Sequence, residues 1–272
     1  MNTQNGTLCI GYDVEAGDPT TTGLFIDAMV KVHEARGTPC TLFIKGKTLE
    51  HSTEHIQKLI GNPLFDLQQH TYSHLVFKRI DCYTGKKHEV YGKDEPLRKI
   101  RADVVKASKV LEKRLNITPI GMTTPFAFYK GLTDRPDILK VLHDAGIRFI
   151  RSWGRNEQGY NPVPLDVQPF FYNEQGFPDM LECTVNGWQD CIWREHHGWK
   201  ARWDEQVNSD IDYVAGHGLF LTLCQHDWSS IQQDPEMAMT AAIIDHANAK
   251  GVRILHYKAF YEEQLGLKSK VK

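Results

Sequence analysis

The sequence lacks several features that mark whole classes of proteins. No apolar run approaches the roughly 18 residues that a membrane-spanning helix needs. The polar first residues show no basic segment followed by an apolar stretch, as a secretory signal would. Lys and Arg (32) do not exceed Asp and Glu (34), so the formal net charge is −2, whereas a protein that binds duplex nucleic acid usually carries a basic surplus. We therefore expect a cytoplasmic protein that binds neither membranes nor nucleic acid.

Cysteine is also scarce, and several motifs are missing. The 272 residues contain six cysteines and no CxxC pair, which excludes a disulfide scaffold. Cys9, Cys40 and Cys224 lie in apolar runs and are expected to be buried, reduced thiols. No GxGxxG follows the first apolar run, which disfavours dinucleotide binding, and no serine has the GxSxG context of a serine hydrolase.

What the chain does contain is an alternation of short apolar runs with longer amphipathic stretches. This alternation predicts an α/β protein, a distorted or incomplete (β/α)7–8 barrel in a single domain over residues 1–272, with a doubly wound open sheet as the competing topology. The predicted strands are 7–12, 40–44, 65–69, 120–123, 148–151, 180–184, 219–224 and 253–256. The predicted helices are 22–36, 52–60, 96–115, 136–144, 204–215 and 236–250. Residues 75–95, rich in charge, Gly and Tyr, are expected to form an irregular insertion.

In a β/α barrel the functional residues follow the carboxyl ends of the strands. The first strand is followed by Asp13 and Glu15, and the third by His70 and His74. On one helical turn, two histidines four residues apart would face the same way and could bind one cation. An acidic residue from the first strand would complete a set of two histidines and one carboxylate, with coordination positions left open for water and substrate.

Other candidate residues have competing interpretations. The segment His51–His55 matches HxxEH, the inverted zinc-peptidase motif, but reads better as polar residues in the first turn of a short helix. His226 is either a proton-transfer group or half of a structural pair with the neighbouring Asp227. Glu182 is either a substrate contact or a buried acid of the barrel.

Aromatic residues gather in the second half of the chain. Four of the six tryptophans lie between Trp188 and Trp203. They either pack in the core or form a platform for sugar rings or another flat ligand. The candidate substrate-binding residues are Thr123, Pro125, Phe126, Trp153 and Trp188.

Four segments together resemble the polysaccharide deacetylase family, also known as carbohydrate esterase family four. They are Gly11–Glu15 (GYDVE), Thr38–Ile44 (TPCTLFI), His70–His74 (HTYSH) and Leu223–His226 (LCQH). The third segment matches the family pattern H-[ST]-x-x-H in full, and the first resembles a D-x-[DE] variant of the family's first motif. The similarity extends from about Thr7 to Tyr257.

This resemblance implies a distorted barrel and hydrolysis of N-acetyl or related amide bonds with one divalent metal ion, usually zinc. It implies that Glu15, His70 and His74 bind the metal ion, that Asp13 is the general base and that His226 is the general acid. One position departs from the family pattern. The third motif normally carries an arginine two residues before its proline, where this chain has Thr123, and threonine cannot supply the positive charge that keeps Asp13 ionised.

We therefore expect a metal-dependent hydrolase of a non-peptide carbon–nitrogen bond, acting on a small or oligosaccharide substrate such as an N-acylated amino sugar. A non-catalytic member of the same fold that binds a carbohydrate or a partner is the first alternative. A barrel glycosidase that uses Asp13 and Glu182 is the second. Nothing in the sequence indicates the oligomeric state.

Overall fold

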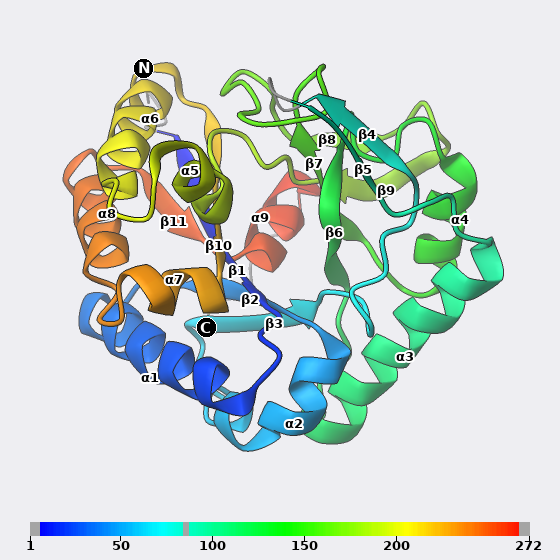
Figure 1. Ribbon diagram of the computed structural model, residues 1–272, viewed down its shortest axis with the longest axis horizontal. Helices are drawn as coiled ribbons and strands as arrows, with labels where there is room; N and C mark the ends of the chain where they lie inside the picture. The colour runs from blue at the N-terminus through cyan, green and yellow to red at the C-terminus, as the bar shows by residue number, and fades with distance from the viewer. Residues whose placement is uncertain (1–5, 84–86, 267–272) are drawn as a thin grey trace.

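The computed structural model describes residues 6–83 and 87–266. Its strands lie at the centre and its helices surround them (Figure 1). The parallel strands are β1 (Thr7–Val14), β2 (Cys40–Ile44), β3 (Phe65–Gln69), β6 (Gly121–Tyr129), β7 (Phe149–Arg155), β9 (Phe177–Glu182), β10 (Phe220–His226) and β11 (Arg253–Leu255). They correspond to the eight predicted strands in order.

The sheet is curved into an incomplete barrel, as predicted. Its strand order is β10-β1-β2-β3-β6-β7-β9-β8, and β11 pairs with the start of β1. The short strand β8 (Phe170–Tyr172), which the sequence analysis missed, runs antiparallel to β9. Across the edge between β9 and β10, Asn186 Nδ2 donates to the Phe220 carbonyl at 2.7 Å, and the Thr222 N–H donates to Asn186 Oδ1 at 3.0 Å. An amide side chain thus replaces part of the missing strand pairing.

The helices cover the outside of the barrel. They are α1 (Pro19–Arg36), α2 (Gly46–Gln57), α3 (Leu97–Leu115), α4 (Pro136–Asp144), α5 (Asp190–His197), α6 (Trp203–His217), α7 (Asp227–Gln233), α8 (Ala238–Ala249) and α9 (Tyr257–Gln264). The sequence analysis missed α5, α7 and α9, which are all short. Among the described residues, no helix has the length and apolar character required to cross a membrane.

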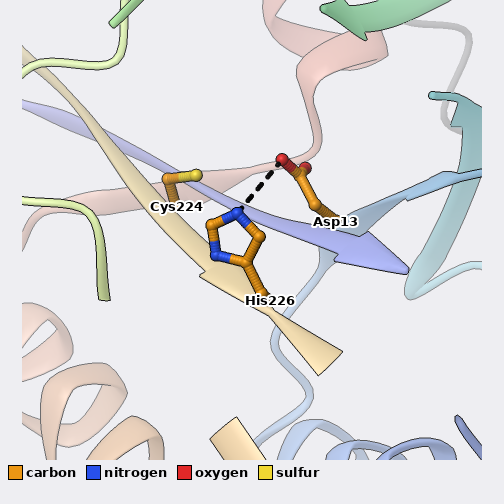
Figure 2. Close-up of side chains that lie close together, drawn as sticks. All are labelled: Asp13, Cys224 and His226. Atoms are coloured by element: carbon orange, nitrogen blue, oxygen red, sulfur yellow. Dashed lines mark ion pairs between the residues drawn. The ribbon is translucent and has the colours of Figure 1, made fainter. Parts of the chain in front are cut away.

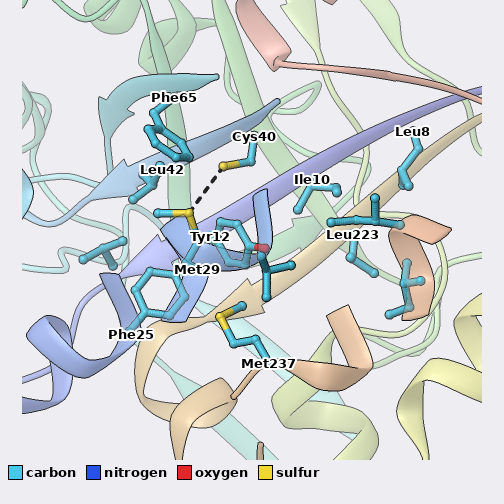
Figure 3. Packing of buried hydrophobic residues seen from close by; sticks show 14 of the residues in the cluster. Leu8, Ile10, Tyr12, Phe25, Met29, Cys40, Leu42, Phe65, Leu223 and Met237 are labelled. Carbon is cyan, nitrogen blue, oxygen red and sulfur yellow. Dashed lines mark hydrogen bonds between the residues drawn. The ribbon is translucent and has the colours of Figure 1, made fainter. Parts of the chain in front are cut away.

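The described residues form three hydrophobic clusters, and two of them lie against the two faces of β1, because successive side chains of a strand point to opposite faces. Tyr12 of β1 packs outward against α1, where Figure 3 shows it beside Phe25 and Met29, and Leu8 and Ile10 belong to the same cluster. Cys9 of the same strand points inward and shares a smaller cluster with Phe149 and with residues of α9. Above this inner cluster, the inward positions are polar.

The predicted insertion 75–95 is more regular than expected. It contains an antiparallel hairpin of β4 (Ile80–Tyr83) and β5 (His88–Tyr91), and residues 84–86 lie outside the described part of the chain. The ring of Tyr91 stacks on Phe126 with a centroid separation of 5.0 Å. The hairpin therefore packs beside the carboxyl end of β6, next to the polar end of the barrel (Figure 1).

Candidate metal and active site

A cavity of about 170 Å³ lies at the carboxyl ends of the strands. Most of the residues predicted to form the site line it: Asp13, Glu15, His70, His74, Thr123, Phe126 and His226. Pro125, Trp153 and Trp188 do not line it. The indole of Trp153 packs against Tyr129 and Phe170, and that of Trp188 lies against side chains of α5.

Glu15, His70 and His74 converge at one side of this cavity. The Oε2 atom of Glu15 lies 3.1 Å from His70 Nε2 and 2.7 Å from His74 Nε2. The other carboxylate oxygen, Oε1, accepts a hydrogen bond of 3.0 Å from the indole N–H of Trp228 in α7. The three side chains thus offer one carboxylate oxygen and two ring nitrogens to one point.

The two histidines reach this point from a loop, and not from the helical turn that their spacing suggested. His70 directly follows β3. Thr71 and His74 have positive φ angles of 57° and 63°, and a right-handed α-helix requires negative φ angles. The carboxylate of Asp103, on α3, accepts hydrogen bonds from the N–H groups of Tyr72 and Ser73 at 2.8 and 3.1 Å. The tertiary contact to α3, which the local sequence does not reveal, brings the imidazoles together.

The hydrogen bonds of His70 fit a divalent metal ion at this point. Its Nδ1 contacts the Thr123 carbonyl at 3.1 Å, so Nδ1 carries the proton of the neutral ring and Nε2 is a bare acceptor. That acceptor faces a carboxylate oxygen, an arrangement that a cation between them would satisfy. Orientation of a metal-binding histidine by a carbonyl on its other nitrogen is common in zinc sites.

The electrostatics of the other two residues also suit metal binding. Burial alone would raise the pKa of Glu15, but hydrogen bonds with His70 and His74 outweigh it and hold that pKa well below its usual value. Burial lowers the pKa of His74, although Glu15 opposes the shift. An ionised carboxylate and a neutral imidazole are the forms that bind divalent metal ions.

Asp13 has a cationic partner that the sequence analysis did not identify. The guanidinium of Arg151, on β7, donates from Nη2 to Asp13 Oδ1, and both side chains are buried. Arg151 also donates from Nε to the hydroxyl of Thr123 at 3.2 Å. The expectation that Thr123 leaves Asp13 without a positive charge is therefore wrong, because the neighbouring strand supplies it.

The position of Arg151 follows from strand register. Thr123 of β6 pairs with Arg151 of β7, so both side chains point into the barrel at the same level. Burial alone would lower the pKa of Arg151, but the Asp13 carboxylate outweighs it and keeps that pKa above its usual value. The alternation of Phe149 and Arg151 on the inward face was the signal in the sequence that could have placed this cation.

His226 lies on the opposite side of Asp13 from the metal-binding residues. Its Nε2 is 3.9 Å from Asp13 Oδ2, and its Nδ1 contacts Asp190 Oδ1 at 2.7 Å. Asp190, the first residue of α5, is fully buried and was not assigned a role from the sequence. Burial alone would lower the pKa of His226, but Cys191 and Asp190 hold it well above its usual value.

The adjacent positions of His226 and Asp227 suggested that the two side chains form a pair, but they do not. The Asp227 carboxylate accepts the N–H groups of Glu15 and Ala16, both at 3.1 Å, and so fixes the backbone that carries Glu15. The acid that holds His226 comes from 36 residues earlier in the chain. His226 thus has a carboxylate partner, as one sequence interpretation proposed, but that partner is Asp190 and not Asp227.

Two alternatives from the sequence find no support in the geometry. Glu182 lies on the outer face of β9, where its carboxylate accepts hydrogen bonds from Ser152, Trp153 and Tyr172, so it is a buried structural acid. It does not line the cavity and is not placed to form a glycosidase pair with Asp13. In the HxxEH segment, His51 lies in the middle of α2 and His55 in its last turn, so neither is in the first turn.

Comparison with known proteins agrees with this geometry. A search of curated proteins finds no significant match. Nearly the whole chain resembles solved structures at low sequence identity, which supports the fold. A candidate polysaccharide deacetylase from Mycobacterium smegmatis shares 16% identity, with a TM-score of 0.70 over 98% of this chain and 92% of that one. The PuuE allantoinase shares 12% identity, with a TM-score of 0.69 over 98% and 92%.

A third similar structure is a carbohydrate esterase family four pseudoenzyme from Bacillus anthracis, at 13% identity and a TM-score of 0.54, over 96% of this chain and 66% of that one. The family model for polysaccharide deacetylases matches residues 8–150, more than half of the sequence. The matched region contains Asp13, Glu15, His70 and His74, the residues that meet in the cavity. The chain therefore belongs to the polysaccharide deacetylase family.

Proposed function

We propose that the chain is a metal-dependent hydrolase that removes an acyl group from a small N-acylated amino sugar or a related small amide. The observation that carries this proposal is the convergence of Glu15, His70 and His74 in the same cavity as Asp13 and His226. One zinc ion is the proposed cofactor, since imidazole and carboxylate ligands suit it. When bound, such an ion lowers the pKa of water and polarises a carbonyl group.

The protein's own groups divide the proton transfers between them. Asp13, whose carboxylate accepts a hydrogen bond from the Arg151 guanidinium, accepts a proton from the attacking water. His226, whose raised pKa keeps its ring protonated, donates a proton to the leaving amine, without which an amide bond does not break readily. The two groups face each other across 3.9 Å, so the attacking water and the leaving nitrogen lie within reach of both.

The size of the cavity favours a small substrate. Its volume of about 170 Å³ is below the roughly 300–1,000 Å³ of typical ligand pockets. Phe126 forms part of the wall at 43% exposure, and Arg155 fixes that wall by donating from Nε to the carbonyls of Phe126 and Ala127 at 3.0 and 3.1 Å. This apolar wall beside the metal-binding residues suits the acyl group.

An acyl-release assay tests the proposal. The purified protein, stripped with chelator and reloaded with zinc, is tested against a panel of N-acetylated amino sugars and small cyclic amides. We expect turnover that chelator abolishes and zinc restores. Asp13→Asn should keep its zinc and lose turnover by a factor of about 100 or more, whereas Asp81→Asn, on the exposed hairpin, should change neither.

Activity in chelator would contradict the proposal, and so would full turnover of Asp13→Asn. Tight binding of panel sugars without hydrolysis would instead support the non-catalytic alternative. The contact between Arg151 and Asp13 removes the observation that had favoured that alternative, the absence of a cation beside the base.

A further inference from the structure

A second group of metal-binding atoms lies in the cavity and shares no residue with Glu15, His70 and His74. Asp13, Cys224 and His226 each offer one ligand atom, and these atoms lie within 4.8 Å of one another. Figure 2 shows the Cys224 sulfur and the Asp13 carboxylate facing the same ring nitrogen of His226. Cys224 and His226 are two residues apart on β10, so both side chains point into the barrel.

Each of the three donor atoms is available. Arg151 occupies Asp13 Oδ1, which leaves Oδ2 directed at His226. Asp190 occupies His226 Nδ1, which leaves Nε2 directed at Asp13. A carboxylate that orients a histidine through its second nitrogen is a common support for bound zinc. The thiol of Cys224 contacts only the Gln189 side-chain oxygen, at a distance of 3.9 Å, among the hydrogen bonds of the described residues.

We propose that Asp13, Cys224 and His226 form a second metal site, which binds Zn²⁺ or Cd²⁺ in excess and inhibits the enzyme. Binding releases the Cys224 thiol proton and the proton on His226 Nε2 to the buffer, and it forms a metal–sulfur and a metal–nitrogen bond with no change of oxidation state. A thiolate ligand selects zinc or cadmium over Mg²⁺ and Mn²⁺. The inhibitory effect depends on the proposed function, because the ion would occupy both the base and the acid, whereas the binding itself does not.

The neighbouring group of Asp190, Cys191 and His226 provides the matched control. It is also compact enough for an ion, but Asp190 already accepts hydrogen bonds from His226 Nδ1 and from the N–H of Cys191, both at 2.7 Å. An ion there would have to break these contacts. We therefore expect Cys191, and not Cys224, to be dispensable for the second metal ion.

Metal titration of the full chain tests the site. Equilibrium dialysis against zinc should give about two ions per wild-type chain, and about one for Cys224→Ala and for Glu15→Gln. Titration with Co²⁺ should produce a thiolate-to-metal charge-transfer absorption that persists in Cys191→Ala and in Glu15→Gln. Cys224→Ala should lose it. Excess zinc, but not excess Mn²⁺, should lower wild-type turnover at least tenfold relative to one equivalent of zinc.

The outcomes separate this inference from the proposed function. One zinc ion per wild-type chain, lost in Glu15→Gln and accompanied by no thiolate absorption, would overturn the second site and leave the first intact. Thiolate absorption that persists in Cys224→Ala would overturn the assignment of the ligand. No bound zinc at all would contradict both proposals. The wild-type spectrum alone can exclude the site, so the test does not depend on the folding of any variant.

Discussion

Arg151 and Asp13 face each other inside the barrel, where both are nearly inaccessible to solvent. The guanidinium lies 4.7 Å from the ring of Phe43, so an aromatic face and a carboxylate hold it together. The family pattern places its cation two residues before the third-motif proline, and this chain places it on the next strand. The net charge beside the proposed base is the same, although the residue that supplies it differs.

Replacing Arg151 with methionine should therefore lower kcat by a factor of about 100, within the range found for general-base catalysis. The reason is that the Asp13 carboxylate would lose its partner while staying buried. Steady-state kinetics with a panel substrate measure the change, and zinc content should stay constant. Arg148→Met, at the outer start of the same strand, is the control. Equal effects of the two variants would show that Arg151 acts only through stability.

His33 is a second residue whose surroundings lead to a measurable effect. It is fully buried, its Nδ1–H donates to the Thr38 carbonyl at 2.8 Å, and its Nε2 accepts from the hydroxyl of Tyr12 at 2.8 Å. Burial lowers its pKa to about 4. The folded protein therefore keeps this ring neutral at a pH where the unfolded chain, with a pKa near 6.5, takes up a proton.

Since the unfolded state binds the extra proton, the unfolding free energy should fall as the pH drops from about 6.5 towards 4. At about 1.4 kcal/mol per pH unit, His33 should account for a loss of about 2 kcal/mol at pH 5. Urea unfolding at pH 7 and pH 5 measures this loss. His33→Gln retains one donor and one acceptor without titrating, so its pH dependence should be weaker by that amount. The same slope in both proteins would contradict the assignment.

Among the elements, α3 has a role that its amphipathic pattern does not reveal. Its apolar stripe packs on the barrel as predicted, through residues such as Val104 and Leu111. Its polar side also reaches the site, because Asp103 holds the loop between His70 and His74 and accepts a hydrogen bond of 2.6 Å from the Ser73 hydroxyl. The helix thus supports both the core and the two imidazoles.

Asp103→Ala should weaken zinc binding about tenfold, the lower end of the effect of removing a supporting contact from a metal site. Three hydrogen bonds to the loop would be lost, so the two imidazoles would no longer be held in place. Competition with a chromogenic chelator gives the affinity. Glu112→Ala, on an exposed position of the same helix, should bind zinc as the wild type does. Unchanged affinity in Asp103→Ala would mean that the metal ion itself orders the loop.

The elements also show what could be predicted locally. Helices with clear periodicity were placed within a few residues, and α4 was placed without error. The HxxxH spacing identified two histidines that do lie together. The helical turn expected to bring them together is absent, since Thr71 and His74 adopt left-handed backbone conformations. The hairpin of β4 and β5 was missed because each strand has only four residues, and the contact of Tyr91 with Phe126 is not visible in the local sequence.

At the scale of the whole molecule, Asn186 and Gln168 close the barrel where strand pairing is lacking. Gln168 accepts the Phe220 N–H at 2.8 Å and donates to the Phe220 carbonyl at 3.1 Å, alongside the two contacts of Asn186. Backbone groups at the edge of β10 are thereby satisfied. Side chains from two loops thus make hydrogen bonds to the β10 backbone that a neighbouring strand would otherwise make. Neither loop has a sequence pattern that predicts these hydrogen bonds.

Asn186→Leu should destabilise the fold by about 2 kcal/mol, because the buried N–H of Thr222 would lose its acceptor. The shift in the urea unfolding midpoint, at constant slope, measures the loss. Asn248→Leu, at an exposed position in the last turn of α8, should have little effect. A midpoint for Asn186→Leu equal to that of the wild type would show that water replaces the amide at this edge.

The strands and their alternation with helices could be predicted because each depends on a local pattern, and the family resemblance singled out Glu15, His70 and His74, which the structure brings together. Arg151 and Asp190 could not be predicted, because each acts through a partner more than 30 residues away. The family model ends at residue 150, one position before Arg151. Arg151 and Asp190 both lie outside it, and their roles emerge only from the three-dimensional arrangement.

The pairing of β1 with β10 places Asp13 directly opposite His226. A shift of one residue in this pairing would turn His226 away from the cavity and present Gln225 in its place, because side chains alternate between the faces of a sheet. Glu15 directly follows β1, and His70 and His74 follow β3, so all three ligands would remain, although Glu15 would lose its contacts with Asp227 and Trp228. A misfolded fraction of this kind would retain metal but have no acid, so turnover per bound metal ion, and not metal content, is the measure of correctly folded protein.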